Sequence, residues 1–157
     1  FDLDINYIQS KVNYKIRSVG TIAIQINRGN AKSSSHLSTE RPSSFNRSYN
    51  TMEWYMPFKI KRNIPVFNEI GFSIREEFRN YKAEDANDPI HAGRNHIDSK
   101  YDLWVQRTLL ETVSVTLTGR YRKRTTDSVF DWVKDLKSFN QFQFWCKIEW
   151  NMLYDRY

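Results

Sequence analysis

Residues 56–78 read MPFKIKR, NIP and VFNEIGFSIREEF: an alternating apolar run, a short polar break and a second alternating run. Residues 12–29 (VNYKIR, SVG, TIAIQINRG) and 101–121 (YDLWVQR, TLLE, TVSVTLTGRY) repeat this order. Arg17, Arg62 and Arg107 end the first run of each copy and lie 45 residues apart. An apolar period of two is the period of a strand, so each copy predicts a strand, a tight turn and a strand.

The alternation gives each expected strand one apolar and one polar face, because residues two apart point to the same side. In the first segment, however, Ile5 and Tyr7 are out of phase with Val12 and Tyr14, which predicts either a β-bulge near residues 9–11 or a separate short strand. The expected strands lie at about 1–16, 20–28, 49–62, 66–81, 100–108, 113–124 and 139–154.

Composition is compatible with strands that span a bilayer. The mean hydropathy of the 157 residues is −0.71, and aromatic residues make up 15%. No run approaches the roughly 20 apolar residues of a membrane helix, but membrane strands alternate and average out as hydrophilic. The chain begins at Phe1, so we expect a mature product or a fragment. The single cysteine, Cys146, excludes an internal disulfide and is expected on the apolar face of the last strand.

The connections are expected to be asymmetric. Turns after Arg17, Arg62 and Arg107 take about three or four residues, whereas the other ends carry the polar stretches 30–48, 82–99 and 123–138. Aromatic residues at these junctions predict a girdle at the headgroup depth of a membrane, although they are also simply favourable strand residues. The girdle candidates are Tyr49, Phe78, Tyr81, Tyr101, Tyr121, Phe139 and Phe142, with Trp54 and Trp104 deeper.

Residues 120–150 (RYRKRTTDSVFDWVKDLKSFNQFQFWCKIEW) resemble the closing hairpin of bacterial outer-membrane β-barrels: a strand ending in Tyr and Arg, a polar loop and a final aromatic alternation. Such barrels usually end on an aromatic residue in phase with the lipid face. Tyr154 is in phase and Tyr157 is not, so we expect the last strand to end at Tyr154 or Met152, followed by a short tail. Similar barrels often follow a periplasmic repeat domain, as in exopolysaccharide exporters and surface-protein assembly factors.

The resemblance implies that residues 1–157 form an antiparallel up-and-down transmembrane β-barrel in the bacterial outer membrane, or the C-terminal part of one. The implied function is a conduit, for export or as a passive pore, or the membrane anchor of a surface assembly, and not an enzyme. Seven strands are an odd number, so we expect further strands from the same polypeptide or a neighbouring subunit to complete the barrel.

In this barrel the polar faces line the lumen, with a possible bias toward anions. The lumen candidates are Lys15, Gln25, Lys59, Lys61, Arg75, Glu77, Gln106, Thr116, Arg120, Lys147 and Glu149. Basic residues near the long loops are expected to contact phosphates of lipopolysaccharide, which with outer-membrane lipid is the expected partner. These candidates are Arg79, Lys82, Lys100, Arg122 and Arg124.

The sequence contains only weak signals for nucleic-acid binding, metal binding or catalysis. The net charge is +6, but a basic strand end beside Tyr121 is usually solvated, so we expect no nucleic-acid partner. The loop residues Glu84, Asp85, Asp88, His91 and His96 are possible ligands. An EF-hand loop would need Gly and Glu where Ile90 and His96 stand, and two histidines without cysteine are weak zinc ligands. We therefore expect no metal, cofactor or catalytic residue.

The alternative is a soluble up-and-down barrel or sandwich whose apolar face points inward. Such a protein would bind an apolar ligand or a polyanion.

Overall fold

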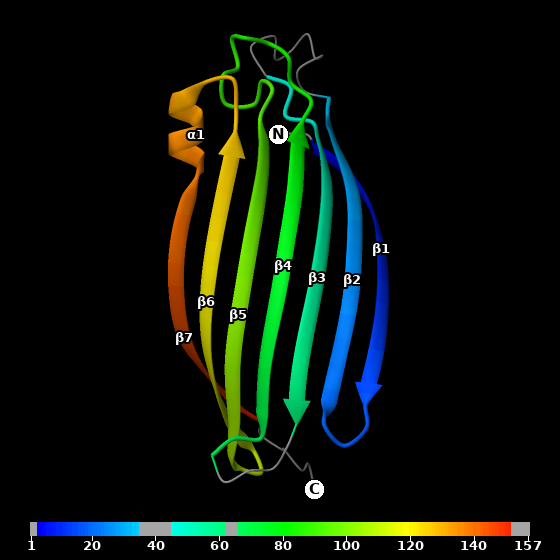
Figure 1. Cartoon of the computed structure of the whole chain (residues 1–157), viewed down its shortest axis with the longest axis vertical. Coiled ribbons are helices and arrows are strands. Elements are labelled where there is room, and N and C mark those ends of the chain that lie inside the picture. Colours follow the sequence, from blue (N-terminus) through cyan, green and yellow to red (C-terminus); the bar gives the residue numbers. More distant parts are fainter. Residues whose placement is uncertain (1–2, 35–44, 62–65, 152–157) are drawn as a thin grey trace, which may run out of the picture.

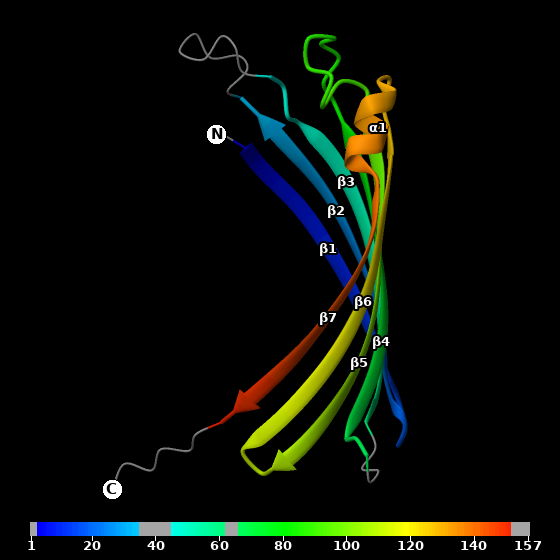
Figure 2. The ribbon, with the colours of Figure 1, turned by 90° about the vertical axis from the view of Figure 1, so that its left-hand side faces the viewer.

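The structure is a computed structural model that describes residues 3–34, 45–61 and 66–151. Seven antiparallel strands form one sheet in chain order (Figure 1). They are β1 (Leu3–Ile16), β2 (Gly20–Ser33), β3 (Tyr49–Lys61), β4 (Glu69–Tyr81), β5 (Asn95–Leu110), β6 (Val113–Asp127) and β7 (Phe139–Trp150). The predicted all-β meander of seven strands is confirmed. The sheet is open, since β1 and β7 lie at its two edges and do not pair (Figure 2).

Short and long connections lie at opposite ends of the sheet (Figure 1). Residues 17–19 and 111–112 are the short turns, and residues 34–48, 82–94 and 128–138 are the long connections. Residues 62–68 join β3 to β4, but the expected turn at Arg62 falls in 62–65, outside the described residues. β5 runs from Asn95 to Leu110, whereas the sequence analysis placed it at about 100–108. Pairing with β6 extends the strand at both ends.

The predicted interruption in β1 is wrong. β1 pairs with β2 without a break from Leu3 opposite Ser33 to Ile16 opposite Gly20. A bulge would leave backbone groups without partners, whereas the continuous ladder pairs them and leaves Ile5 and Tyr7 on the face opposite Val12. The register shift that does occur lies between β5 and β6, at Thr108 and Leu110.

A helix that the sequence analysis did not predict lies in the last long connection. α1 (Asp131–Lys137) packs against β6 and buries Val133 completely. The Ser138 amide donates to the Lys134 carbonyl at 2.9 Å and ends the helix. Seven residues span only two turns, too few to show a clear helical period. Among the described residues, no helix is long and apolar enough to cross a membrane.

The sheet is curved, and its concave face is the polar one. Both edge strands bend to the same side of β4 (Figure 2). Side chains on the inside of a curved sheet crowd one another, and there Asp98 is 0% and Ser73 2% exposed. On the opposite face Phe144 is 80% and Ile148 70% exposed. Within the described residues, the buried apolar side chains are Ala23, Ala31, Ala83, Ala92 and Val133, which do not make a hydrophobic core.

The convex face carries three successive cross-strand rows without a charged residue. Residues directly opposite one another on paired strands share a face, so the registers from β3 to β7 define the rows. They are Met56, Ile74, Tyr101, Tyr121 and Phe142; then Phe58, Phe72, Leu103, Gly119 and Phe144; then Ile60, Ile70, Val105, Leu117 and Cys146. Cys146 thus lies on the apolar face, as predicted.

Gly20 begins β2 and lies tightly against the backbone of β3. A Cβ atom there would lie 1.9 Å from the backbone oxygen of Lys59, so only glycine fits without moving β3. We predict that Gly20→Ala lowers the free energy of unfolding by about 1–3 kcal/mol, whereas Thr21→Ala changes it by less than about 0.5 kcal/mol. Denaturant titration of the two variants measures this difference. Equal losses would show that the contact with Lys59 is not tight.

Candidate functional site: the charged concave face

Asp98 is the most buried charged residue of the concave face. Arg122 donates to it through Nε at 2.8 Å, and Arg124 does so at 3.0 Å. Asp98 is directly opposite Arg124 in the register, and Arg122 is two residues away on the same face. Two guanidinium groups therefore share one carboxylate, and the acid fixes both side chains in place.

A second acid, Asp102, accepts both Nε and Nη2 of Arg120, at 2.6 and 2.9 Å. This is the bidentate geometry that guanidinium and carboxylate groups prefer. The Arg120 guanidinium also lies 5.0 Å from the ring centre of Trp145 on β7. The pair therefore joins three strands across the concave face.

Glu69 lies at the end of the concave face near the short turns and holds three side chains there. It accepts from the Trp104 indole at 2.9 Å and lies 3.5 Å from Lys59 and 3.6 Å from Lys61. The Trp104 ring lies over Gly71, where a Cβ atom would come within 1.9 Å of the ring. The missing side chain of Gly71 therefore makes room for the indole that binds Glu69.

Two further acids of the concave face, Glu53 on β3 and Glu77 on β4, also bind neighbouring polar side chains. Glu77 accepts Arg79 Nε at 2.8 Å, and Glu53 accepts the Asn27 amide at 2.8 Å and lies 4.0 Å from Arg75. Arg79 also lies 4.3 Å from the ring centre of Tyr49.

Basic residues outnumber acidic ones on the strands of this face. Eleven Lys and Arg residues face six Asp and Glu residues, which leaves five positive charges in excess. The basic residues are Lys11, Lys15, Lys59, Lys61, Arg75, Arg79, Lys100, Arg120, Arg122, Arg124 and Lys147, and the acidic ones are Glu53, Glu69, Glu77, Asp98, Asp102 and Glu149.

The structure brings all eleven lumen candidates to this one face. Gln25 and Tyr55 are opposite one another, as are Gln106 and Thr116, and Lys147 lies 2.7 Å from Glu149 on the same strand. Lys15 lies near the short turn of β1. The acids Asp98, Asp102 and Glu69 were missed, although the alternation of β5 already put Asp98 and Asp102 on one face with Lys100.

The five candidates for lipopolysaccharide contact do not lie together. Arg79, Lys100, Arg122 and Arg124 are on the concave face, where Asp98 and Glu77 hold three of them. Arg79 and Arg124 lie two and three residues from the long-loop ends of β4 and β6, and contact with lipopolysaccharide stays a prediction. Lys82 lies just beyond the end of β4, where its amide donates to the Ser48 carbonyl at 2.9 Å.

The predicted aromatic girdle is split between the two faces. Phe78, Tyr101, Tyr121, Phe142 and Trp54 are on the convex face. Tyr49, Tyr81, Phe139 and Trp104 are on the concave face and contact cationic side chains, for example Arg94 at 4.0 Å from the Tyr81 ring centre. These four cannot belong to an outward belt, because the strand period points them inward.

The histidine-containing loop folds as a turn around Asp88. His91 Nδ1 lies 2.8 Å from the Asp88 carboxylate, and the His91 ring lies 5.3 Å from that of Tyr81. His96 belongs to β5 and lies opposite Thr126. In residues 3–34, 45–61 and 66–151, no three His, Cys, Asp or Glu side chains gather as metal ligands would.

Comparison with known proteins adds no further constraint. No protein-family model, no curated protein and no solved structure matches this chain.

We predict that Asp98→Ala lowers stability strongly, because it leaves Arg122 and Arg124 crowded and without their acid. Removing one partner of a buried ion pair costs about 3–5 kcal/mol. Glu149→Ala breaks the exposed pair with Lys147 and should cost less than about 1 kcal/mol. Thermal unfolding of both variants under the same conditions is the measurement. A small effect of Asp98→Ala would mean that solvent screens this pair.

Proposed function

We propose that this chain supplies seven neighbouring strands of a transmembrane β-barrel in the bacterial outer membrane, and that its concave face lines a polar conduit. The observation that carries the proposal is the reversed polarity of the curved sheet. Its crowded concave face holds the ion pairs, and its exposed convex face holds the uncharged rows. In water, an apolar convex face exposed to solvent is unfavourable. It becomes favourable when lipid covers the convex face and water fills the space inside the concave face.

Strand length supports the same proposal. The strands contain 12 to 16 residues, and a tilted strand needs only about 9–11 to cross a bilayer. The asymmetry of the connections fits as well, because outer-membrane barrels have short turns on the periplasmic side and long loops outside. We therefore place residues 17–19 and 111–112 on the periplasmic side.

The direction of the edge strands limits how the barrel closes. β1 leads into the short turn at 17–19 and β7 follows the long connection at 128–138, so both run from the long-loop end to the short-turn end. Direct pairing of β7 with β1, in one chain or between copies, would be parallel. Antiparallel closure needs an odd number of additional strands between them, so copies of this seven-stranded unit cannot close by themselves.

The soluble alternative requires the apolar face to point inward. The curvature is opposite to that requirement, and a sandwich would need a second sheet over the convex face. No observation favours this alternative over the membrane barrel.

The lipid-facing test compares arginine on the two faces. In the assembled protein, Phe72→Arg or Phe144→Arg, both in the middle uncharged row, should cost about 2–4 kcal/mol of folding into vesicles near mid-bilayer. Thr116→Arg, on the concave face beside Gln106, should cost far less because its charge meets water. Folding yields into phospholipid vesicles over a urea series measure the three costs. Equal costs on both faces would refute the membrane assignment.

A conduit with this face inside should prefer anions. We predict that the assembled protein, in planar bilayers under a KCl gradient, gives a reversal potential on the anion-selective side. Lys59→Glu with Lys61→Glu changes the lumen charge by four units and should move the potential toward cation selectivity. Matched substitutions on the convex face, Val105→Ala and Leu117→Ala, should leave it unchanged. An assembled protein without conductance would indicate the anchor function instead.

A further inference from the structure

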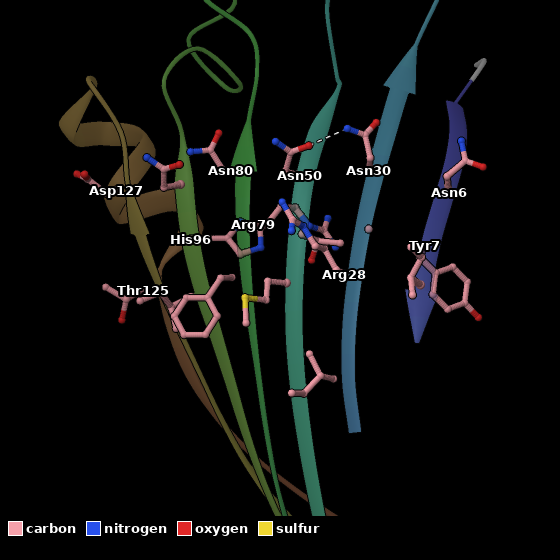
Figure 3. Close-up of a pocket in the computed structure, with 18 residues that line it drawn as sticks. Asn6, Tyr7, Arg28, Asn30, Asn50, Arg79, Asn80, His96, Thr125 and Asp127 are labelled. Carbon is pink, nitrogen blue, oxygen red and sulfur yellow. Dashed lines mark hydrogen bonds between the residues drawn. The ribbon is translucent and has the colours of Figure 1, made fainter. Parts of the chain in front are cut away.

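A row of carboxamides crosses the convex face at the long-loop end. Successive registers place Asn6 opposite Asn30, Asn30 opposite Asn50, Asn50 opposite Asn80, Asn80 opposite Asn95, and Asn95 opposite Asp127. Six strands thus carry five asparagines and one aspartate in register, which we call the amide row. Figure 3 shows Asn30, Asn50 and Asn80 on neighbouring strands at one level.

Most of the hydrogen-bonding capacity of the amide row is open. Asn50, Asn80 and Asn95 are exposed. Asn30 donates to Asn50 at 2.8 Å, and this is the one side-chain hydrogen bond of the row in the part of the chain that the structure describes. Each carboxamide has two donors and an acceptor, so the row can bind a partner rich in hydroxyl groups.

The amide row borders a hollow of about 1280 Å³ whose other side is a mixed row. The mixed row contains Ile8, Arg28, Met52, Phe78, Ile97 and Thr125, one register step closer to the apolar rows. Arg28 has no acidic partner among the described residues. One side of the hollow therefore offers carboxamides and the Asp127 carboxylate, and the other offers mostly apolar side chains and the Arg28 guanidinium. Tyr7, Thr51, Arg79 and His96 of the concave face also line it.

The height of the amide row fits a headgroup layer. Asn80 follows Phe72, in the middle uncharged row, by eight residues on β4, which is about 26 Å along the strand. With a strand tilt of about 40°, the rise is about 20 Å. The hydrocarbon half-thickness is about 15 Å. If Phe72 lies at mid-bilayer, Asn80 lies beyond the acyl chains.

We propose that the hollow binds a phosphorylated glycolipid of the outer leaflet. Its sugar hydroxyls bond the amide row, a phosphate pairs with Arg28, and an acyl chain lies along Met52 and Phe78. Charge and polarity both favour this occupant: guanidinium and phosphate attract each other, and carboxamides and hydroxyl groups exchange hydrogen bonds. The inference rests on the proposed membrane location.

The test measures binding of lipopolysaccharide, truncated to lipid A and phosphorylated core sugars, by the assembled protein in phospholipid vesicles. The variant N50A/N80A/R28Q removes two amides and the guanidinium. The control N13A/Q141A removes two exposed amides of the concave face. We expect about a tenfold loss of affinity for the first variant, equivalent to one or two lost hydrogen bonds, and less than a twofold change for the control.

Five outcomes would overturn the proposal. Wild-type affinity in N50A/N80A/R28Q would exclude the hollow as the site, and an equal loss in the control would show an effect that is not specific to it. If deacylated core sugar competes as strongly as the intact lipid, the occupant is a free glycan. Wild-type protein that enters vesicles but shows no preference for lipopolysaccharide refutes this inference alone. Protein that fails to enter any vesicle refutes the membrane location as well.

Discussion

Backbone pairing along seven long strands positions every other feature of this sheet, because the described residues form no apolar core that could do so. The ladder from β1 to β2 spans Leu3 to Ile16 without a break, even though that register turns Ile5 and Tyr7 to the polar face. Where side-chain preference and backbone hydrogen bonding conflict, the backbone prevails, since an unpaired peptide group costs more than a misplaced apolar side chain at an exposed edge.

The paired backbone sets side chains in rows, and curvature then gives the two sets of rows different surroundings. On the concave side Asp98, Asp102 and Glu69 each join basic or indole groups from neighbouring strands, so the charges are held by cross-strand contacts. On the convex side the three rows through Tyr101, Leu103 and Val105 carry only uncharged residues from β3 to β7. One sheet therefore presents a polar interior and an apolar exterior, which is the combination that a barrel in lipid requires.

Polarity also changes along the strands of the convex face, from the uncharged rows to the amide row. From Phe72 to Asn80 the convex face of β4 passes from apolar residues through Glu76, which accepts the Trp54 indole at 3.1 Å, to carboxamides. A lipid leaflet changes from acyl chain to headgroup over a comparable distance. In the proposed barrel, the convex and concave faces of the same strands would thus bind different partners, a glycolipid outside and a passing solute inside.

The sequence by itself determined the strands, their alternation and the asymmetry of the connections, because a period of two and the spacing of polar stretches are local properties. It also placed the eleven lumen candidates on one face. Register and curvature were decided only in the tertiary structure. The asparagines at 6, 30, 50, 80 and 95 follow no period along the chain and meet only through pairing. Likewise Arg122 and Arg124 looked like free rim cations until β5 brought Asp98 beside them, since a cross-strand partner depends on register and not on local sequence.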